Sequence, residues 1–148
     1  MSQQILVLDC YRHTLTVIRS LSLAGYEVTL GVTADELDRG FVHVSRHVSS
    51  TWLHPDIIDD PAGFDAALLD FLGVNPRLKL IYPVGDNSVR KLASIRADIS
   101  PGVLVTMPEN DTVETCLDKP TAREVAKTCQ IPVPGFRKRM YRNILNRR

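Results

Sequence analysis

The chain has 148 residues, of which 44% are hydrophobic, enough for one domain with its own core or for one domain with an appendage. No apolar run approaches the roughly 18 residues that a membrane-spanning helix needs, so the composition argues against a membrane protein. The net charge is +1, yet residues 1–135 hold all 17 acids and 12 of the 18 bases, whereas residues 136–148 hold six bases and no acid.

The first half of the chain predicts strands that alternate with helices. Ile5 to Leu8 is a continuous apolar run, typical of a strand that is buried on both faces. Apolar residues at helical spacing then predict a helix over about residues 14–24, and Gly25 is expected to end it. The next expected elements are a strand at 27–32, irregular structure with a short helix at 34–38, and a strand at 48–53.

The second half continues the alternation. Asp60 and Pro61 predict the start of a helix that Gly73 ends. Its apolar side would hold Phe64, Ala67, Leu68, Phe71 and Leu72. The elements expected after it are a strand at 78–82, a helix at about 88–97, a strand at 103–105 and a short helix at 110–116.

A further helix is expected to begin after Asp118, whose carboxylate can accept the free N–H groups of a first helical turn. Pro120 fits that turn because its missing N–H has no partner there. Ala122, Val125, Ala126 and Cys129 would form one apolar stripe. The chain then leaves in an extended conformation through residues 131–134, because a residue that precedes proline avoids the α region.

Strands and helices that alternate through the first 107 residues predict an α/β fold. We expect a three-layer open parallel sheet of about five strands, with a C-terminal linker helix. Ligands of such a sheet bind beyond the carboxyl ends of its strands. The turn at residues 9–13 contains no glycine, which excludes a dinucleotide-binding turn, and the chain has no P-loop motif. Asp9 stands alone, without the further acids and the lysine of a phosphoacceptor regulatory domain.

The order of these elements resembles the N-terminal (pre-ATP-grasp) domain of ATP-grasp ligases, most closely the carbamoyl-phosphate-synthase-like, ATP-dependent carboligases. The resemblance covers nearly all of residues 4–135 and rests on several segments together. They are Ile5–Asp9 with Arg12, Ile18–Leu21, Ala24–Val28, Ser45–Val48, Ile81–Asp86, the Asp118-Lys119 pair and Pro132-Val133-Pro134. The resemblance implies a Rossmann-like domain over residues 1–107, linker helices over 108–135 and a basic tail over 136–148.

In that family this domain shapes one wall of the acceptor-substrate site of a carboxylate–amine or carboxylate–thiol ligase, which works through an acyl phosphate. The resemblance implies that Arg12 and Asp86 face the substrate cleft, together with Asp9 and Asn87 in the same two turns. It also implies that Lys119 approaches the phosphates of ATP, and helix N-termini favour such anions. The simpler alternatives are that Arg12 is a solvated turn residue and that Asp86 caps helix 88–97.

ATP and Mg²⁺ belong to the catalytic body that follows the Pro-Val-Pro exit in the family. Here residues 136–148 follow instead, as a shifted reading frame, a truncation or a real appendage. We therefore expect the chain to be inactive alone, with no tightly bound cofactor and no metal site. The alternative is a stand-alone Rossmann-like module that binds a small ligand and uses its basic tail for a partner.

The expected partners are a small carboxylate or amine substrate, the missing ATP-grasp domain and, through an uncovered apolar patch, a second copy of the chain as a homodimer. The tail combines bases with Phe136 and Tyr141, as nucleic-acid binders do, but the acidic body argues against nucleic acid.

The cysteines and histidines give weaker signals. Cys10, Cys116 and Cys129 share no Cys-x-x-Cys spacing and no secretory signal is visible, which predicts reduced thiols in the cytoplasm. Cys10 is either a reactive thiolate in the first turn or, as we expect, a buried thiol. His43, His47 and His54 lack the helical pattern and the carboxylate of a metal site, so we expect structural or surface roles.

Overall fold

The computed structural model describes residues 3–134, and the predicted basic tail lies outside them. The chain divides into two compact units, of which the first ends at Glu114 and the second begins at Thr115. Within the described residues, no helix is long and apolar enough to cross a membrane.

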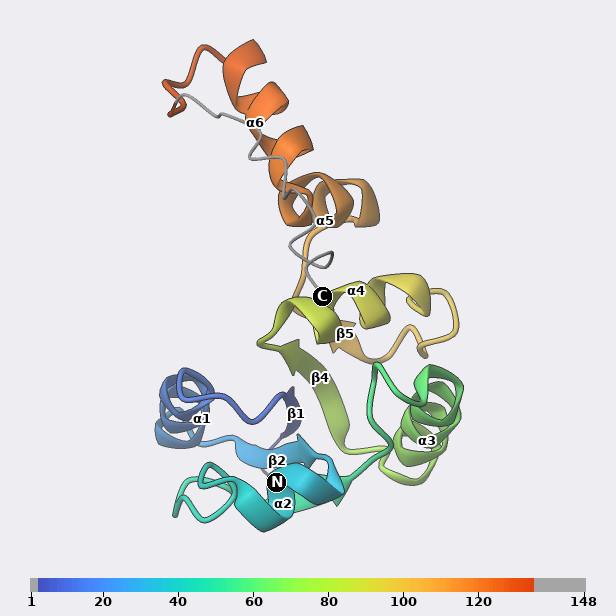
Figure 1. Ribbon diagram of the computed structural model, residues 1–148. Coiled ribbons are helices and arrows are strands. Elements are labelled where there is room, and N and C mark those ends of the chain that lie inside the picture. Colours follow the sequence, from blue (N-terminus) through green and yellow to red (C-terminus); the bar gives the residue numbers. More distant parts are fainter. Residues whose placement is uncertain (1–2, 135–148) are drawn as a thin grey trace, which may run out of the picture. The chain divides into compact units, whose positions relative to one another are not determined.

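The first unit is an α/β fold around a five-stranded parallel sheet, which confirms the predicted fold class (Figure 1). Its strands are β1 (Gln4–Leu8), β2 (Glu27–Val32), β3 (Ser50–Leu53), β4 (Leu78–Pro83) and β5 (Leu104–Val105), in the spatial order β3-β2-β1-β4-β5. Strand β3 begins two residues later than predicted, because the N–H of Val48 donates to Ser45 O in a turn.

Helices join the strands and mostly begin where the sequence predicts. They are α1 (Thr14–Leu23), α2 (Ala34–Arg39), α3 (Pro61–Val74), α4 (Asp86–Ser94) and α5 (Asn110–Leu117), with α6 (Lys119–Thr128) in the second unit. Gly25 follows α1 with a φ of +90°, as expected of a residue that ends a helix. Helix α3 continues through Gly73 to Val74, and α4 begins two residues before the predicted start because Gly85 is its N-cap.

Two apolar clusters cover the two faces of the sheet, and successive residues of β1 alternate between them. Leu6 and Leu8 belong to the cluster that contains Phe64 and Leu68 of α3. Ile5 and Val7 belong to the other cluster, which contains Ile18 of α1 and three residues of β2. Because side chains of a strand alternate between its faces, β1 is buried on both sides and the sheet lies between two helical layers.

A polar chain links three adjacent strands near the edge where β1 and β2 begin. The Nε2 of Gln4 donates to Thr29 Oγ1 at 2.9 Å, and Thr29 Oγ1 lies 2.8 Å from Ser50 Oγ. Thr29 is buried, with an exposed fraction of 2%, so its hydroxyl needs these partners. They fit only the observed register, in which Thr29 pairs with Leu6 and with Ser50.

The second unit contains α6, and Asp118 caps it as predicted. The Asp118 carboxylate accepts the N–H of Thr121 at 3.0 Å, and Pro120 lies in the first turn. No residue of α6 is fully buried, and Val125 is 47% exposed. The predicted apolar stripe is therefore only partly covered within the described residues.

Replacing Phe64 by alanine should destabilise the first unit by about 3–5 kcal/mol, because the ring is fully buried in the α3 cluster and its loss leaves a cavity. Urea unfolding followed by circular dichroism measures this change. Leu69→Ala, in the same helix but 37% exposed, is the matched control and should cost clearly less. Equal losses in the two variants would contradict the assignment of Phe64 to the core.

Candidate functional site

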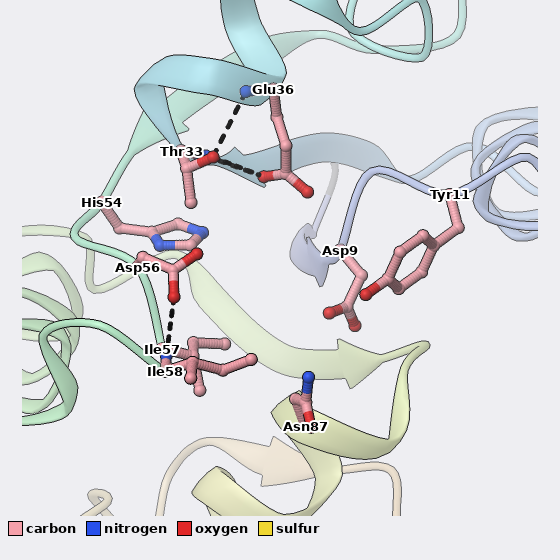
Figure 2. A pocket seen from close by; sticks show the side chains of 9 residues that line it. All are labelled: Asp9, Tyr11, Thr33, Glu36, His54, Asp56, Ile57, Ile58 and Asn87. Atoms are coloured by element: carbon pink, nitrogen blue, oxygen red, sulfur yellow. Dashed lines mark hydrogen bonds between the residues drawn. The ribbon is translucent and has the colours of Figure 1, made fainter. Parts of the chain in front are cut away.

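The strand order reverses direction at one point in the sheet, between β1 and β4. The chain runs from β1 outward to β2 and β3, and then returns to place β4 on the other side of β1. In open parallel sheets this is where ligands bind, beyond the carboxyl ends of the strands. A cavity of about 80 Å³ lies at these ends (Figure 2). Its lining residues are Asp9, Tyr11, Thr33, Glu36, His54, Asp56, Ile57, Ile58 and Asn87.

Asp9 follows β1 and holds the turn between β4 and α4. Its Oδ2 accepts the N–H of Val84 at 3.0 Å and that of Gly85 at 2.7 Å, and the hydroxyl of Ser88 donates to the same oxygen. Asp9 has a φ of +78°, a left-handed conformation that aspartate tolerates better than most residues. The carboxylate therefore fixes the two turns of the switch point to each other.

Tyr11 lies beside this carboxylate. Its backbone N–H donates to the buried Thr14 hydroxyl at 3.2 Å, and its ring lies over Gly85, where a Cβ would come within 2.8 Å of Tyr11 Cε2. Burial is the main cause that raises the pKa of the Tyr11 phenol. The second cause is negative charge nearby, from Asp9, Glu36, Asp56 and Asp86. The phenol of Tyr11 therefore stays neutral beside these carboxylates.

Glu36 and Asp56 each use one carboxylate oxygen to accept hydrogen bonds from neighbouring residues of the same segment. Glu36 Oε2 accepts the N–H of Thr33 at 2.8 Å and its hydroxyl at 3.2 Å, in a capping box at the start of α2. Asp56 Oδ1 accepts the N–H groups of Ile58 at 2.7 Å and Asp59 at 3.0 Å. These bonds hold both carboxylates in place at the ends of β2 and β3.

His54 is a buried histidine in the lining, with an exposed fraction of 7%. Its Nδ1 lies 2.8 Å from the carbonyl oxygen of Pro55, which can only accept, so Nδ1 carries a hydrogen. The ring contacts Trp52 and meets Phe64 edge-on. Gly31 leaves the room for it, since a Cβ there would lie 3.2 Å from the imidazole ring.

Two of the residues expected at the substrate cleft, Asp9 and Asn87, line the cavity. Arg12 is exposed and lies outside the lining. Asp86 is also exposed and outside it, at the first position of α4, and the simpler prediction that it caps this helix is wrong because Gly85 takes that position. Asp86 contributes to the site through its charge on Tyr11.

Lys119 belongs to the second unit, where it is exposed at the first position of α6. It lines a groove along α6 and the extended exit, together with Pro120, Thr121, Arg123, Glu124, Lys127, Val133 and Pro134. Three of these eight side chains are basic and one is acidic. The groove therefore has a net positive lining, unlike the cavity of the first unit.

The sequence prediction missed the contributions of the loops after β2 and β3. Thr33, Glu36, His54 and Asp56 all follow strand ends, which is the signal that could have revealed them. Among residues 3–134, no group of three His, Cys, Asp or Glu side chains could hold a metal ion. His47 instead has its Nδ1 3.2 Å from the Ser22 hydroxyl.

Comparison with known proteins gives a match in structure. No family's sequence profile matches the chain, and no curated protein does. The biotin carboxylase domain of a single-chain bacterial carboxylase shares 19% identity, covers 91% of this chain with 31% of its own length, and has a TM-score of 0.66. L-amino acid ligase from Bacillus licheniformis shares 13% identity over 92% of this chain and 32% of its own, with a TM-score of 0.68.

A single-chain, multi-domain long-chain acyl-CoA carboxylase matches with 22% identity over 93% of this chain and 14% of its own, and a TM-score of 0.63. The chain thus spans less than a third of the length of each of these structures. At these identities the likeness shows the fold alone. The likeness agrees with the open parallel α/β fold that the sequence predicts.

Replacing Asp9 by alanine should lower the free energy of unfolding by about 2–3 kcal/mol, because three donors lose a charged acceptor. Asp86→Ala, the neighbouring exposed acid, should cost less than about 1 kcal/mol through its position in the first turn of α4. Urea unfolding of the two variants side by side measures both changes. If Asp9→Ala is as stable as Asp86→Ala, the role of Asp9 in joining the turns is refuted.

Cys10 should be the slowest of the three cysteines to react with iodoacetamide at neutral pH. Burial raises the pKa of its thiol and the charge of Glu36 adds to this, so its thiolate fraction is smaller than that of an ordinary cysteine. Cys116 and Cys129 are exposed and serve as internal controls. Peptide mapping by mass spectrometry gives the three rates, and a fastest rate at Cys10 would revive the reactive thiolate that we set aside.

Proposed function

We propose that this chain is the N-terminal, acceptor-side domain of an ATP-grasp ligase that joins a carboxylate to an amine or a thiol. The main observation that supports this proposal is the cavity at the carboxyl ends of β1 to β4, in a fold shared with biotin carboxylase domains and an L-amino acid ligase. The order of segments through Asp118-Lys119 and Pro132-Val133-Pro134 supports the same assignment.

In the proposed reaction a carboxylate oxygen attacks the γ-phosphorus of ATP, which gives an acyl phosphate and ADP. The acceptor nitrogen or sulfur then attacks the acyl carbon and releases inorganic phosphate. The ATP-grasp body would hold ATP and Mg²⁺, and this chain would hold the acceptor. We infer that the chain alone binds Mg-ATP weakly and does not catalyse the reaction.

Lys119 would contribute to the nucleotide side. Its position at the start of a helix of ten residues places a cation at the positive end of the helix dipole, and both favour a phosphate. The lining of the α6 groove adds Arg123 and Lys127. The Asp118 carboxylate accepts hydrogen bonds from the N–H and the hydroxyl of Thr121, and these bonds order the turn that contains Lys119.

A polypeptide in which residues 1–134 are followed by an ATP-grasp body should bind Mg-ATP, and isothermal titration calorimetry measures the affinity. Lys119→Ala should weaken that affinity about tenfold, since one phosphate contact is lost. Lys79→Ala removes an exposed lysine of β4, far from α6 in sequence, and should leave the affinity unchanged. An extended polypeptide without measurable Mg-ATP binding would rule out the ligase assignment.

A stand-alone binding module remains a second candidate, and one observation favours it. Every lining residue of the cavity lies between Asp9 and Asn87, so the cavity is complete within the first unit. The two candidates differ in the DNA that follows codon 135. ATP-grasp coding sequence in any of the three frames supports the ligase, whereas a stop codon followed by unrelated DNA supports the module.

A further inference from the structure

We propose that the cavity of the first unit selects a cationic ligand and binds the protonated amine of a small molecule. The proposal rests on the proposed function only in identifying this amine as the acceptor of the ligase. The charge and the hydrogen-bonding character of the cavity are independent of that assignment.

The lining is acidic and contains no lysine or arginine. Asp9, Glu36 and Asp56 each anchor a loop through one carboxylate oxygen, which is Oδ2, Oε2 and Oδ1 respectively. The other oxygen of each carboxylate accepts no hydrogen bond from residues 3–134. Three fixed side chains from the ends of β1, β2 and β3 thus keep spare acceptors at one cavity (Figure 2).

His54 supplies an independent observation. Its ring is buried, and because Nδ1 carries the hydrogen that faces Pro55, Nε2 of the neutral ring has a free lone pair. Nε2 has no hydrogen-bond partner among the described residues. Figure 2 shows the outer edge of this ring directed into the space between the labelled side chains. An unpaired acceptor that faces the cavity can take a hydrogen bond from a donor of the ligand.

An ammonium group meets these requirements, because it has three N–H donors, no acceptor and a positive charge. A carboxylate or phosphate would meet three carboxylates of like charge in the same lining. The charges that raise the pKa of the Tyr11 phenol agree with this negative field. A cavity of about 80 Å³ has room for the ammonium and a short carbon chain, and Ile57 and Ile58 offer that chain an apolar wall.

A divalent metal ion is the competing cation, and the structure favours the amine. Among the described residues no three His, Cys, Asp or Glu side chains lie close enough to share a metal. Ammonium hydrogen bonds reach further than metal–oxygen bonds and suit acceptors that are spread around a cavity. The metal is therefore an outcome that the experiment must separate.

The test is an NMR titration of the ¹⁵N-labelled full chain with ethylammonium chloride, at constant ionic strength. The three non-hydrogen atoms of this probe limit its affinity to about millimolar. We expect saturable shifts of the Tyr11 amide and the His54 ring nitrogens. Sodium propionate, which carries the same ethyl group on a negative head group, should produce none. Saturable binding of propionate, no saturable response to ethylammonium, or the same shifts with Mg²⁺ at lower concentration would overturn the proposal.

Asp56→Asn should weaken ethylammonium binding about tenfold, because it removes a charge while Oδ1 can still accept the N–H groups of its own loop. Asp38→Asn, an exposed acid of α2 outside the cavity, should leave the binding unchanged. Equal weakening in both variants would mean that binding depends only on the net charge of the protein, and this would overturn the proposal. Glu36→Gln repeats the test at the start of α2, in case Asp56→Asn does not fold.

This inference and the ligase proposal fail separately. Ethylammonium binding without Mg-ATP binding by the extended polypeptide keeps the amine site and removes the ligase. Mg-ATP binding by the extended polypeptide without any response of the cavity to ethylammonium keeps the ligase and removes the amine site.

Discussion

The carboxylate of Asp9 is the contact on which the ligand end of the first unit depends. Apolar clusters cover both faces of the sheet, but at its switch point two turns lie side by side with backbone donors that need acceptors. One oxygen of Asp9 satisfies the N–H groups of Val84 and Gly85 and the hydroxyl of Ser88. A single side chain thus joins segments 75 to 79 residues apart, and it does so next to the cavity. If the cavity binds a ligand as we propose, this residue would couple stability to binding.

Most of the fold could be predicted from the sequence, because its signals are local. The apolar run at Ile5 to Leu8 identified the central strand, and Asp60 and Asp118 marked the starts of α3 and α6 through their carboxylates. The errors occurred where tertiary contacts override such signals. Helix α4 begins at Asp86 because Asp9 orders the turn before it, an interaction across 76 residues that no local pattern records.

The candidate site was harder to predict than the fold. Asp9 stood out because it follows β1 directly, and Asn87 because it belongs to the polar turn that follows the predicted strand at 78–82. Glu36 and Asp56, four and three residues beyond the ends of β2 and β3, belong to segments that gave no such signal. Only the order of the strands brings these loops to one cavity. In the sequence, His54 was one of three histidines for which we expected structural or surface roles, and its place in the cavity comes from burial against Trp52 and Phe64. Such side chains meet because of the order of the strands in the sheet. The sequence predicted a parallel sheet but not this order.

The polar chain from Gln4 through Thr29 to Ser50 has a consequence for how such a domain can change over time. It fixes the sheet at the edge opposite the cavity, since sliding β2 by one residue would leave the Thr29 hydroxyl unpaired inside the core. Beyond the other edge, loop positions that do not hold the turns can then change in charge without disturbing the strand register. A fold anchored in this way can exchange one small ligand for another by substitutions in its loops alone.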